Sequence, residues 1–187
     1  MSTAAVRILG VDPGLNITGY GVLEVSRTSV RVCEAGVVRG RTKTSIGARL
    51  AEIHAGMADV IASLKPEAMA IEQLYAHYKH PRTAILMGHA RGIICLAAAQ
   101  AGVPIISYSA TQIKKVLTGN GHAPKSQMQL AIRRELALAE VPEPPDVADA
   151  LAIALCHYYL QTRRALIEEK VPGTFSAPPE ARRKKGS

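Results

Sequence analysis

The chain has 187 residues, of which 48% are apolar, and carries a formal net charge of +8 with a pI near 9.6. This length and composition suffice for the core of one domain, without disulfides or structural metals. The basic charge favours an anionic partner, most simply nucleic acid. A membrane surface is the rival, although no basic amphipathic helix with bulky aromatic residues supports it.

The cysteines predict a reducing compartment. Cys33, Cys95 and Cys156 are isolated in apolar surroundings and form no CxxC pair, so we expect buried free thiols. We expect no membrane-spanning run either, because the longest candidate, around Ile93 to Ile106, is broken by a glycine and a proline. The N-terminus lacks a signal pattern. Together these features predict a cytoplasmic protein.

The first third of the chain predicts the antiparallel start of a sheet. Val6–Val11 and Gly19–Val25 are apolar strands joined by a turn over Asp12–Thr18, and Val30–Val38 is the next strand. Ser45–Leu64 then carries apolar residues at the spacing of an amphipathic helix.

The remainder alternates strands with helices. We expect short strands at Ala68–Glu72 and Val103–Tyr108. The helix predicted between them, Pro81–Ala101, contains Gly88 and Gly92 and would allow a neighbour to approach closely. Three further helices are expected, over Ser109–Leu117, Lys125–Ala139 and Pro145–Glu168. This order of elements implies an α/β fold, with a mixed sheet and helices on its faces.

The chain shows no internal repeat, and its last segment differs in composition. Residues 171–187 are proline-rich and then basic. We therefore expect one domain over residues 1–170 followed by a disordered basic tail. The ARRKK run in the tail is typical of a solvated charge cluster, and a loose phosphate contact is the alternative.

Four carboxylates stand at the ends of predicted elements. Asp12 ends the first strand, Glu72 ends the fourth, and Asp146 and Asp149 open the last helix. Two of them have ordinary explanations, since Asp12 could bond the amides of its turn and Asp146 could cap the helix. Glu72 directly follows a buried strand, which is unfavourable unless it is paired or faces a cleft. Asp149 shares one face of a largely buried helix with Asp146.

If the four acids converge, their crowded negative charges need a positive partner. Carboxylate oxygens are the ligands that Mg²⁺ and Mn²⁺ prefer. Two such ions about 4 Å apart can stabilise both the attacking and the leaving oxygen of a phosphoryl transfer. The residues alone therefore suggest metal-dependent phosphoryl transfer, provided that the acids meet in the fold.

Four stretches together resemble one family. ILGVDPGLNITGYGVLEV, AIEQLY, GHARG and DVADALAIALCH occur in the order and at nearly the spacing of the RuvC family of Holliday junction resolvases. The resemblance covers about residues 6 to 162. A strand–DPG–strand hairpin alone also resembles the phosphate-binding hairpin of sugar kinases and actin-like ATPases, whereas the four stretches together are specific.

The resemblance implies an RNase H-like fold and a homodimer. It implies a Mg²⁺-dependent endonuclease, with Mn²⁺ as a substitute and two ions in each site, that nicks opposed strands of four-way DNA and leaves 5′ phosphates. The family's acidic positions fall on Asp12, Glu72, Asp146 and Asp149. It also suggests the RuvA–RuvB branch-migration complex as a partner, a contact that nothing in the residues shows.

The resemblance assigns DNA contacts to Lys114, Lys125 and Tyr75. From the residues alone, Lys114 has the pattern of a solvated lysine, and Lys125 begins a helix after the glycine-rich TGNGHAPK loop, where a phosphate fits. Tyr75 could belong to the core, or it could stack on a base near the junction centre. Its loop, EQLYAHYKHPR, is one residue longer than usual in the family, so Tyr78 is the rival for that role.

Two other classes of function are weaker alternatives. A non-catalytic nucleic-acid binder with this fold would not need all four acids. An actin-like or sugar-kinase-like phosphotransferase would need a second lobe, for which 187 residues leave no room. The sequence therefore favours a structure-selective endonuclease of DNA recombination and repair.

Overall fold

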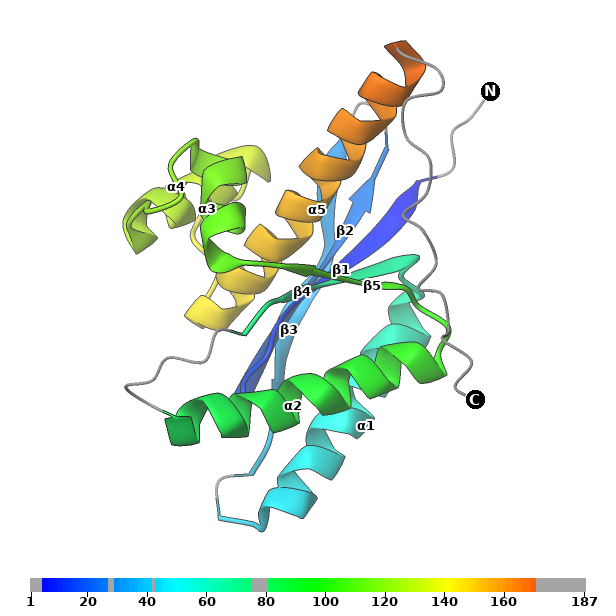
Figure 1. Ribbon diagram of the computed structural model, residues 1–187, viewed down its shortest axis with the longest axis vertical. Coiled ribbons are helices and arrows are strands. Elements are labelled where there is room, and N and C mark those ends of the chain that lie inside the picture. The colour runs from blue at the N-terminus through cyan, green and yellow to red at the C-terminus, as the bar shows by residue number, and fades with distance from the viewer. Residues whose placement is uncertain (1–4, 27–28, 42, 75–80, 171–187) are drawn as a thin grey trace, which may run out of the picture.

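The computed structural model describes residues 5–26, 29–41, 43–74 and 81–170, without the side chains of residues 81 and 163–170. In this part of the chain, a five-stranded mixed sheet lies between two layers of helices (Figure 1). The strands are β1 (Val6–Asp12), β2 (Ile17–Val25), β3 (Val30–Arg39), β4 (Ala68–Glu72) and β5 (Ile105–Tyr108). The helices are α1 (Ile46–Leu64), α2 (Pro81–Gln100), α3 (Ala110–Thr118), α4 (Lys125–Glu135) and α5 (Pro145–Lys170).

The strand order, β3-β2-β1-β4-β5, brings chain-distant strand ends to one edge of the sheet. β1 pairs antiparallel with β2, and Asp12 lies opposite Gly19. β1, β4 and β5 run parallel, and Glu72 lies opposite Tyr108. Because parallel strands end at the same edge, Asp12 and Glu72 emerge side by side.

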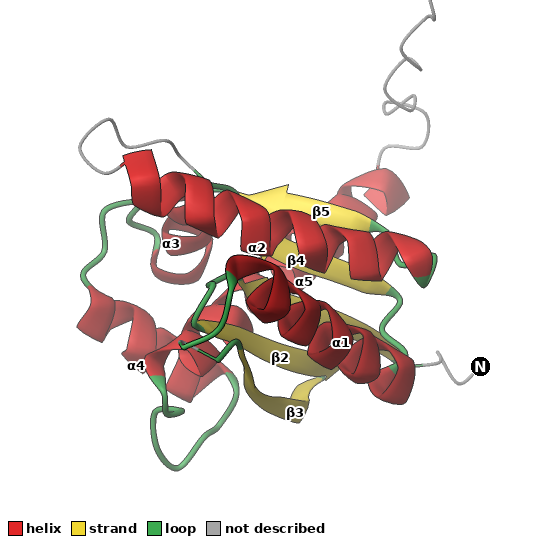
Figure 2. Ribbon diagram, turned by 90° about the horizontal axis from the view of Figure 1, so that it is seen from below, coloured by secondary structure: helices red, strands yellow, loops and turns green. Residues whose placement is uncertain are grey.

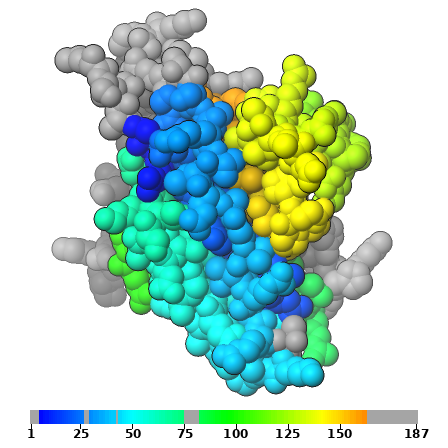
Figure 3. Space-filling model, turned by 180° about the vertical axis from the view of Figure 1, so that it is seen from behind, coloured from blue at the N-terminus to red at the C-terminus, as the bar shows by residue number. Residues whose placement is uncertain are grey.

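Each face of the sheet has its own hydrophobic core. Leu9 and Val11 of β1 pack toward α1 and α2, whereas Ile8 packs toward α3, α4 and α5. Figure 2 shows α1 and α2 in front of the sheet and α5 behind it. From the opposite side, the β2–β3 hairpin (blue) runs between α1 (cyan) and the chain around residues 130–150 (yellow) in Figure 3. The alternation of side chains along each strand separates these two cores.

Two glycines bring the backbone of α5 against the sheet. A Cβ atom on Gly10 would lie 2.1 Å from the Ala150 carbonyl oxygen, and one on Gly19 would lie 2.1 Å from the Asp146 carbonyl oxygen. No other residue type fits at these two positions without displacing α5. The start of α5, with its acids, is therefore held close to the end of β1.

The predicted α/β fold with a mixed sheet is confirmed. Most element bounds shift by one or two residues, and two of the shifts have clear local reasons. α4 ends at Glu135 instead of Ala139, because Ala137 adopts a left-handed conformation with φ 50°. β5 begins at Ile105 instead of Val103, because the Val103 amide closes the end of α2 on the Ala98 carbonyl.

The prediction of buried thiols is wrong for one cysteine. All three cysteines are free, Cys156 is buried and Cys95 is half-buried, but Cys33 is exposed. Cys33 lies on β3, an edge strand with no buried residue. The expected tail over residues 171–187 lies outside the described residues.

The expectation that no apolar run reaches membrane-spanning length is also wrong. In the described residues one helix segment, Arg82–Gln100 of α2, is long and apolar enough by length and composition, and 22% of that window is buried. Ala90, Ile94 and Ala97 nevertheless belong to the core beneath the sheet. α2 therefore has one face in the protein core and an unusually apolar outer face.

Candidate active site

Asp12 stands at the end of β1, beside a turn that is fixed by another residue. The fully buried Thr18 donates from Oγ1 to the Gly14 carbonyl oxygen at 2.8 Å and accepts from the Gly14 amide at 3.4 Å. Within the described residues the Asp12 carboxylate itself accepts no protein hydrogen bond. The turn interpretation of Asp12 therefore fails, and its carboxylate remains available at the sheet edge.

Glu72 ends β4 next to Asp12. The ladder continues one residue beyond it, because the Gln73 amide donates to the Tyr108 carbonyl oxygen at 2.8 Å. The Glu72 side chain is half-buried and lines a cavity at this edge. Of the two alternatives for this acid, a paired carboxylate or one that faces a cleft, the structure shows the second.

Asp146 and Asp149 enter the same region from the start of α5. The alternative that Asp146 caps the helix is excluded, because α5 begins at Pro145, as predicted, and Asp146 lies inside the first turn. Proline is favoured at a first helical position, where its missing amide hydrogen is not needed. The helix dipole favours an acid in this turn, and Asp149 follows it nearly one turn later.

The charges of these acids reach one another. Burial, followed by the charges of Glu72 and Asp149, raises the pKa of the Asp12 carboxyl to about 7. Asp146 adds a smaller effect in the same direction, which Lys125 partly offsets. Burial, followed by the charge of Asp149, likewise raises the pKa of Glu72. The structure therefore brings the four predicted acids into one electrostatic cluster, which we call the acidic cluster.

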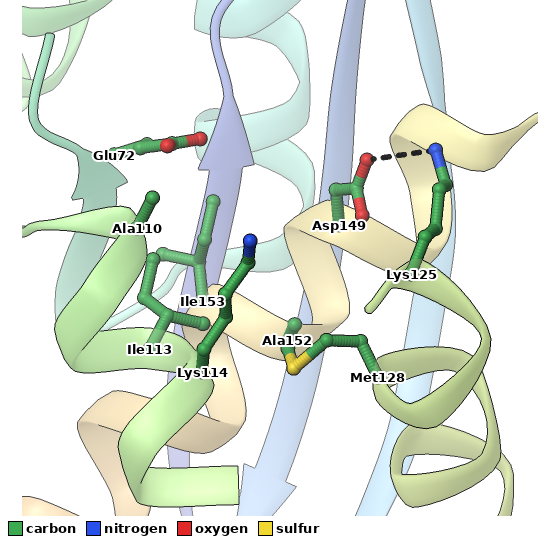
Figure 4. A pocket seen from close by; sticks show the side chains of 9 residues that line it. All are labelled: Glu72, Ala110, Ile113, Lys114, Lys125, Met128, Asp149, Ala152 and Ile153. Atoms are coloured by element: carbon green, nitrogen blue, oxygen red, sulfur yellow. Dashed lines mark ion pairs between the residues drawn. The ribbon is translucent and has the colours of Figure 1, made fainter. Parts of the chain in front are cut away.

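Two lysines border a cavity of about 280 Å³ beside the acidic cluster (Figure 4). Lys125 places its Nζ 3.6 Å from Asp149 Oδ2, and Lys114 extends between Glu72 and Asp149. Burial raises the pKa of Asp149, and the Lys125 ammonium opposes that rise. The apolar wall consists of Ala110, Ile113, Met128, Ala152 and Ile153.

The lysine positions follow from local structure. α3 ends at Thr118 and is capped by Gly119, which adopts φ 77° and donates its amide to the Lys115 carbonyl oxygen. The chain then turns back, and α4 begins at Lys125 as predicted. Lys114 faces the cavity, whereas its neighbour Lys115 is exposed. Tyr75 and its rival Tyr78 lie outside the described residues.

The acidic cluster has the chemistry of a divalent-cation site but an open geometry. Among the described side chains, no three Asp, Glu, His or Cys residues lie close enough together to hold a metal ion. Asp12 and Asp146 also lie outside the wall of the cavity. The donors are nevertheless all carboxylate oxygens, and burial together with the neighbouring carboxylates raises the pKa of Asp12. That donor set fits Mg²⁺ or Mn²⁺, whose charge would draw the acids together.

Sequence reasoning missed the residues that support this site. Thr18 looked like an ordinary residue of the turn, and the apolar wall residues looked like ordinary core. The one available signal was the Gly19 and Gly21 pair in β2, since alternate glycines in a strand mark the close approach of another backbone.

Comparisons with known proteins fit this architecture. Crossover junction endodeoxyribonuclease RuvC of Rhodopirellula baltica is 59% identical over 155 residues, covering 82% of this chain and 86% of that protein. Thermus thermophilus RuvC, solved in complex with Holliday junction substrate, has a TM-score of 0.77 at 35% identity and covers 85% of this chain and 96% of that one.

A more distant structure defines the class by fold alone. The yeast mitochondrial Holliday junction resolvase Ydc2 has a TM-score of 0.59 at 13% identity, covering 91% of this chain and 89% of that one. The fold is that of the RNase H-like resolvases. The family described as crossover junction endodeoxyribonuclease RuvC matches residues 8–157. The chain belongs to this family of nucleases.

Proposed function

We propose that this protein resolves four-way DNA junctions by paired, metal-dependent nicks during recombination and repair. The observation that carries the proposal is the acidic cluster beside Lys114 and Lys125, in a chain that belongs to a nuclease family. The relative solved with Holliday junction substrate supports the choice of DNA structure.

The residues divide the work between cation and phosphate. Asp12, Glu72, Asp146 and Asp149 hold and orient the cations, and their carboxylates do not attack. Bound Mg²⁺, with two ions in each site, supplies an activated water and stabilises the departing 3′ oxygen, so that the nick carries a 5′ phosphate. Mn²⁺ substitutes for it, because both ions prefer oxygen ligands.

The lysines bring the scissile phosphate to the acids. Lys125 is 56% exposed and pairs with a carboxylate that is itself 44% exposed, so this ion pair can open at small cost. A DNA phosphate then takes the place of Asp149 beside Lys125. Lys114 balances charge between Glu72 and the incoming strand. Tyr75, assigned from the resemblance alone, stacks at the junction centre.

A second copy of the chain would place two such sites on one junction. The outer face of α2 exposes Ile85 (61%) and Leu96 (47%), with open space above Gly88 and Gly92 between them. Small residues between apolar ones allow two helices to approach closely, and an isologous dimer matches the two-fold symmetry of a junction. We therefore include in the proposal a homodimer that uses this face of α2. Sedimentation of Leu96→Glu should show monomers, with Leu130→Glu on α4 as the exposed apolar control.

The cellular setting belongs to the same proposal. Work in the cytoplasm alongside the RuvA–RuvB branch-migration complex is implied by the family resemblance. No described contact speaks for or against that partner.

A synthetic four-way junction with labelled strands tests the proposed function. Wild-type protein with Mg²⁺ should nick two opposed strands at symmetric positions, and the nicks should be sealed by a ligase. Addition of EDTA should abolish nicking and preserve binding, and a linear duplex of the same sequence should stay intact. Junction binding without any nick in Mg²⁺ or Mn²⁺ would refute the nuclease and favour the non-catalytic binder.

A further inference from the structure

The guanidinium of Arg91, on α2, forms hydrogen bonds to the ends of β4 and β5 beside the acidic cluster. Arg91 Nε donates to the Glu72 carbonyl oxygen at 3.1 Å, and its Nη2 donates to Ser107 Oγ at 2.7 Å. Glu72 and Ser107 lie on β4 and β5, which are paired neighbours in the sheet. One side chain thus ties two strands together at the edge where the acids emerge.

The contact acts on the backbone of an acid of the proposed site. The orientation of the Glu72 peptide sets the direction of its Cα–Cβ bond and therefore where the carboxylate points. The β4–β5 ladder also holds this strand end, since Glu72 pairs with Tyr108 and the following Gln73 amide donates to the Tyr108 carbonyl oxygen. A charged donor to a carbonyl oxygen is stronger than a neutral one. Arg91 therefore adds a charged hydrogen bond to the ladder that fixes Glu72.

Arg91 approaches from the layer opposite to the other acids. Asp146 and Asp149 come from α5, whereas Arg91 comes from α2 beneath the sheet. It lies near the middle of α2 in a half-buried position, where a guanidinium without a partner would be unfavourable. Both of its described bonds go to the sheet edge, so its placement there is specific.

We infer that Arg91 is a positioning residue for Glu72: it fixes the end of β4 so that the Glu72 carboxylate meets the cation at the acidic cluster. This role acts through Glu72 and requires no contact of Arg91 with cation or DNA. This inference rests on the proposed function, because it assigns Arg91 a role in the metal site of that nuclease.

The test compares Arg91→Met with a matched control, Arg7→Met. Arg7 Nη1 also donates to a backbone carbonyl, that of Leu64, at 2.8 Å, and it lies at the far end of β1 from the acids. Both variants lose an arginine-to-backbone hydrogen bond in a half-buried setting. Only Arg91→Met should raise the Mg²⁺ concentration for half-maximal nicking, by about tenfold, because, of its two lost hydrogen bonds, the one to the Glu72 carbonyl acts directly on the acid.

Two readouts separate positioning from general damage. Without metal, the two variants should melt at similar temperatures and bind four-way DNA within about twofold of wild type, because neither residue faces the DNA-binding lysines. With Mg²⁺ alone and no DNA, wild type and Arg7→Met should gain thermal stability, whereas Arg91→Met should gain much less at the same concentration. Arg91→Lys, which retains one charged donor, should recover part of both effects.

Several outcomes overturn the inference. If Arg91→Met and Arg7→Met need the same Mg²⁺ concentration for half-maximal nicking, the Arg91 hydrogen bonds do not position the Glu72 carboxylate. If Arg91→Met does not fold, Ser107→Ala keeps the question open to test, because it removes only the second anchor of the guanidinium. Ser107→Ala must then raise the Mg²⁺ requirement, and an unchanged requirement refutes the inference. Absence of nicking by wild type would instead refute the proposed function.

Discussion

Replacing Asp12 with asparagine should stabilise the metal-free protein. Burial and the surrounding carboxylates raise the pKa of Asp12 from 3.8 to about 7, so the folded state resists ionisation of this group. The unfolded chain releases the proton near pH 4, and the folded chain retains it until about pH 7. The stability of metal-free wild type therefore falls as pH rises through that window.

The size of this effect follows from the same linkage. A rise of the pKa from 3.8 to about 7 corresponds to a loss of about 4 kcal/mol of folding free energy at pH 8. This value is an upper bound, because the neighbouring acids titrate together with Asp12. Asp12→Asn removes the ionisation and should recover much of this free energy. For a domain of this size, the melting temperature should rise by roughly 5–15 °C.

The assay is thermal or urea unfolding in EDTA at several pH values. The gain from Asp12→Asn should be present at pH 8 and disappear below about pH 3, where wild type is protonated in both states. Asp59→Asn, which changes an exposed acid on α1, is the control and should have little effect. Added Mg²⁺ should stabilise wild type more than Asp12→Asn. A variant that is no more stable than wild type at pH 8, or whose gain is the same at every pH, would refute the electrostatic reasoning.

Three further substitutions test the supporting structure. Gly19→Ala should destabilise the protein by several kcal/mol in urea unfolding, because its Cβ would collide with the α5 backbone, whereas Gly47→Ala, with open space around it, should be neutral or slightly stabilising. Tyr108→Phe should cost about 1–3 kcal/mol by leaving the buried His157 ring without its 2.7 Å partner, and Tyr159→Phe, which loses an exposed bond, should cost less. Lys125→Ala should flatten the slope of log affinity against log salt by about 0.9 for four-way and linear DNA alike, and an unchanged slope would remove Lys125 from the phosphate contacts.

The sequence predicted the elements of this fold well because its apolar patterns are local. Ala68–Glu72 has the predicted bounds, since a short apolar run is enclosed by Pro66 and by its own terminal acid. The placement of acids at element ends followed from the same patterns. Because β1 and β4 are parallel, their last residues lie at the same edge of the sheet, and the start of α5 packs against that edge, so the acids could meet there.

The rest depended on contacts between distant segments. The Arg91 hydrogen bond to the Glu72 carbonyl oxygen joins residues 19 positions apart in the chain. Nothing in the GHARG stretch indicates that its arginine turns toward the end of β4. The sequence predicted the helix start at Pro145 but left a capping role for Asp146 open, because the two alternatives differ by only one residue. The exposure of Cys33 depended on β3 being the edge strand, which is a property of the assembled sheet.

The most direct measurement of the central claim is junction nicking by Glu72→Gln beside Glu67→Gln. Both substitutions neutralise one glutamate of the β4 region, but Glu67 is exposed at the opposite end of the strand from the acidic cluster. With Mg²⁺, Glu67→Gln should make the same paired nicks as wild type, whereas Glu72→Gln should bind the junction and make none. Paired nicking by Glu72→Gln at the wild-type rate would contradict the account.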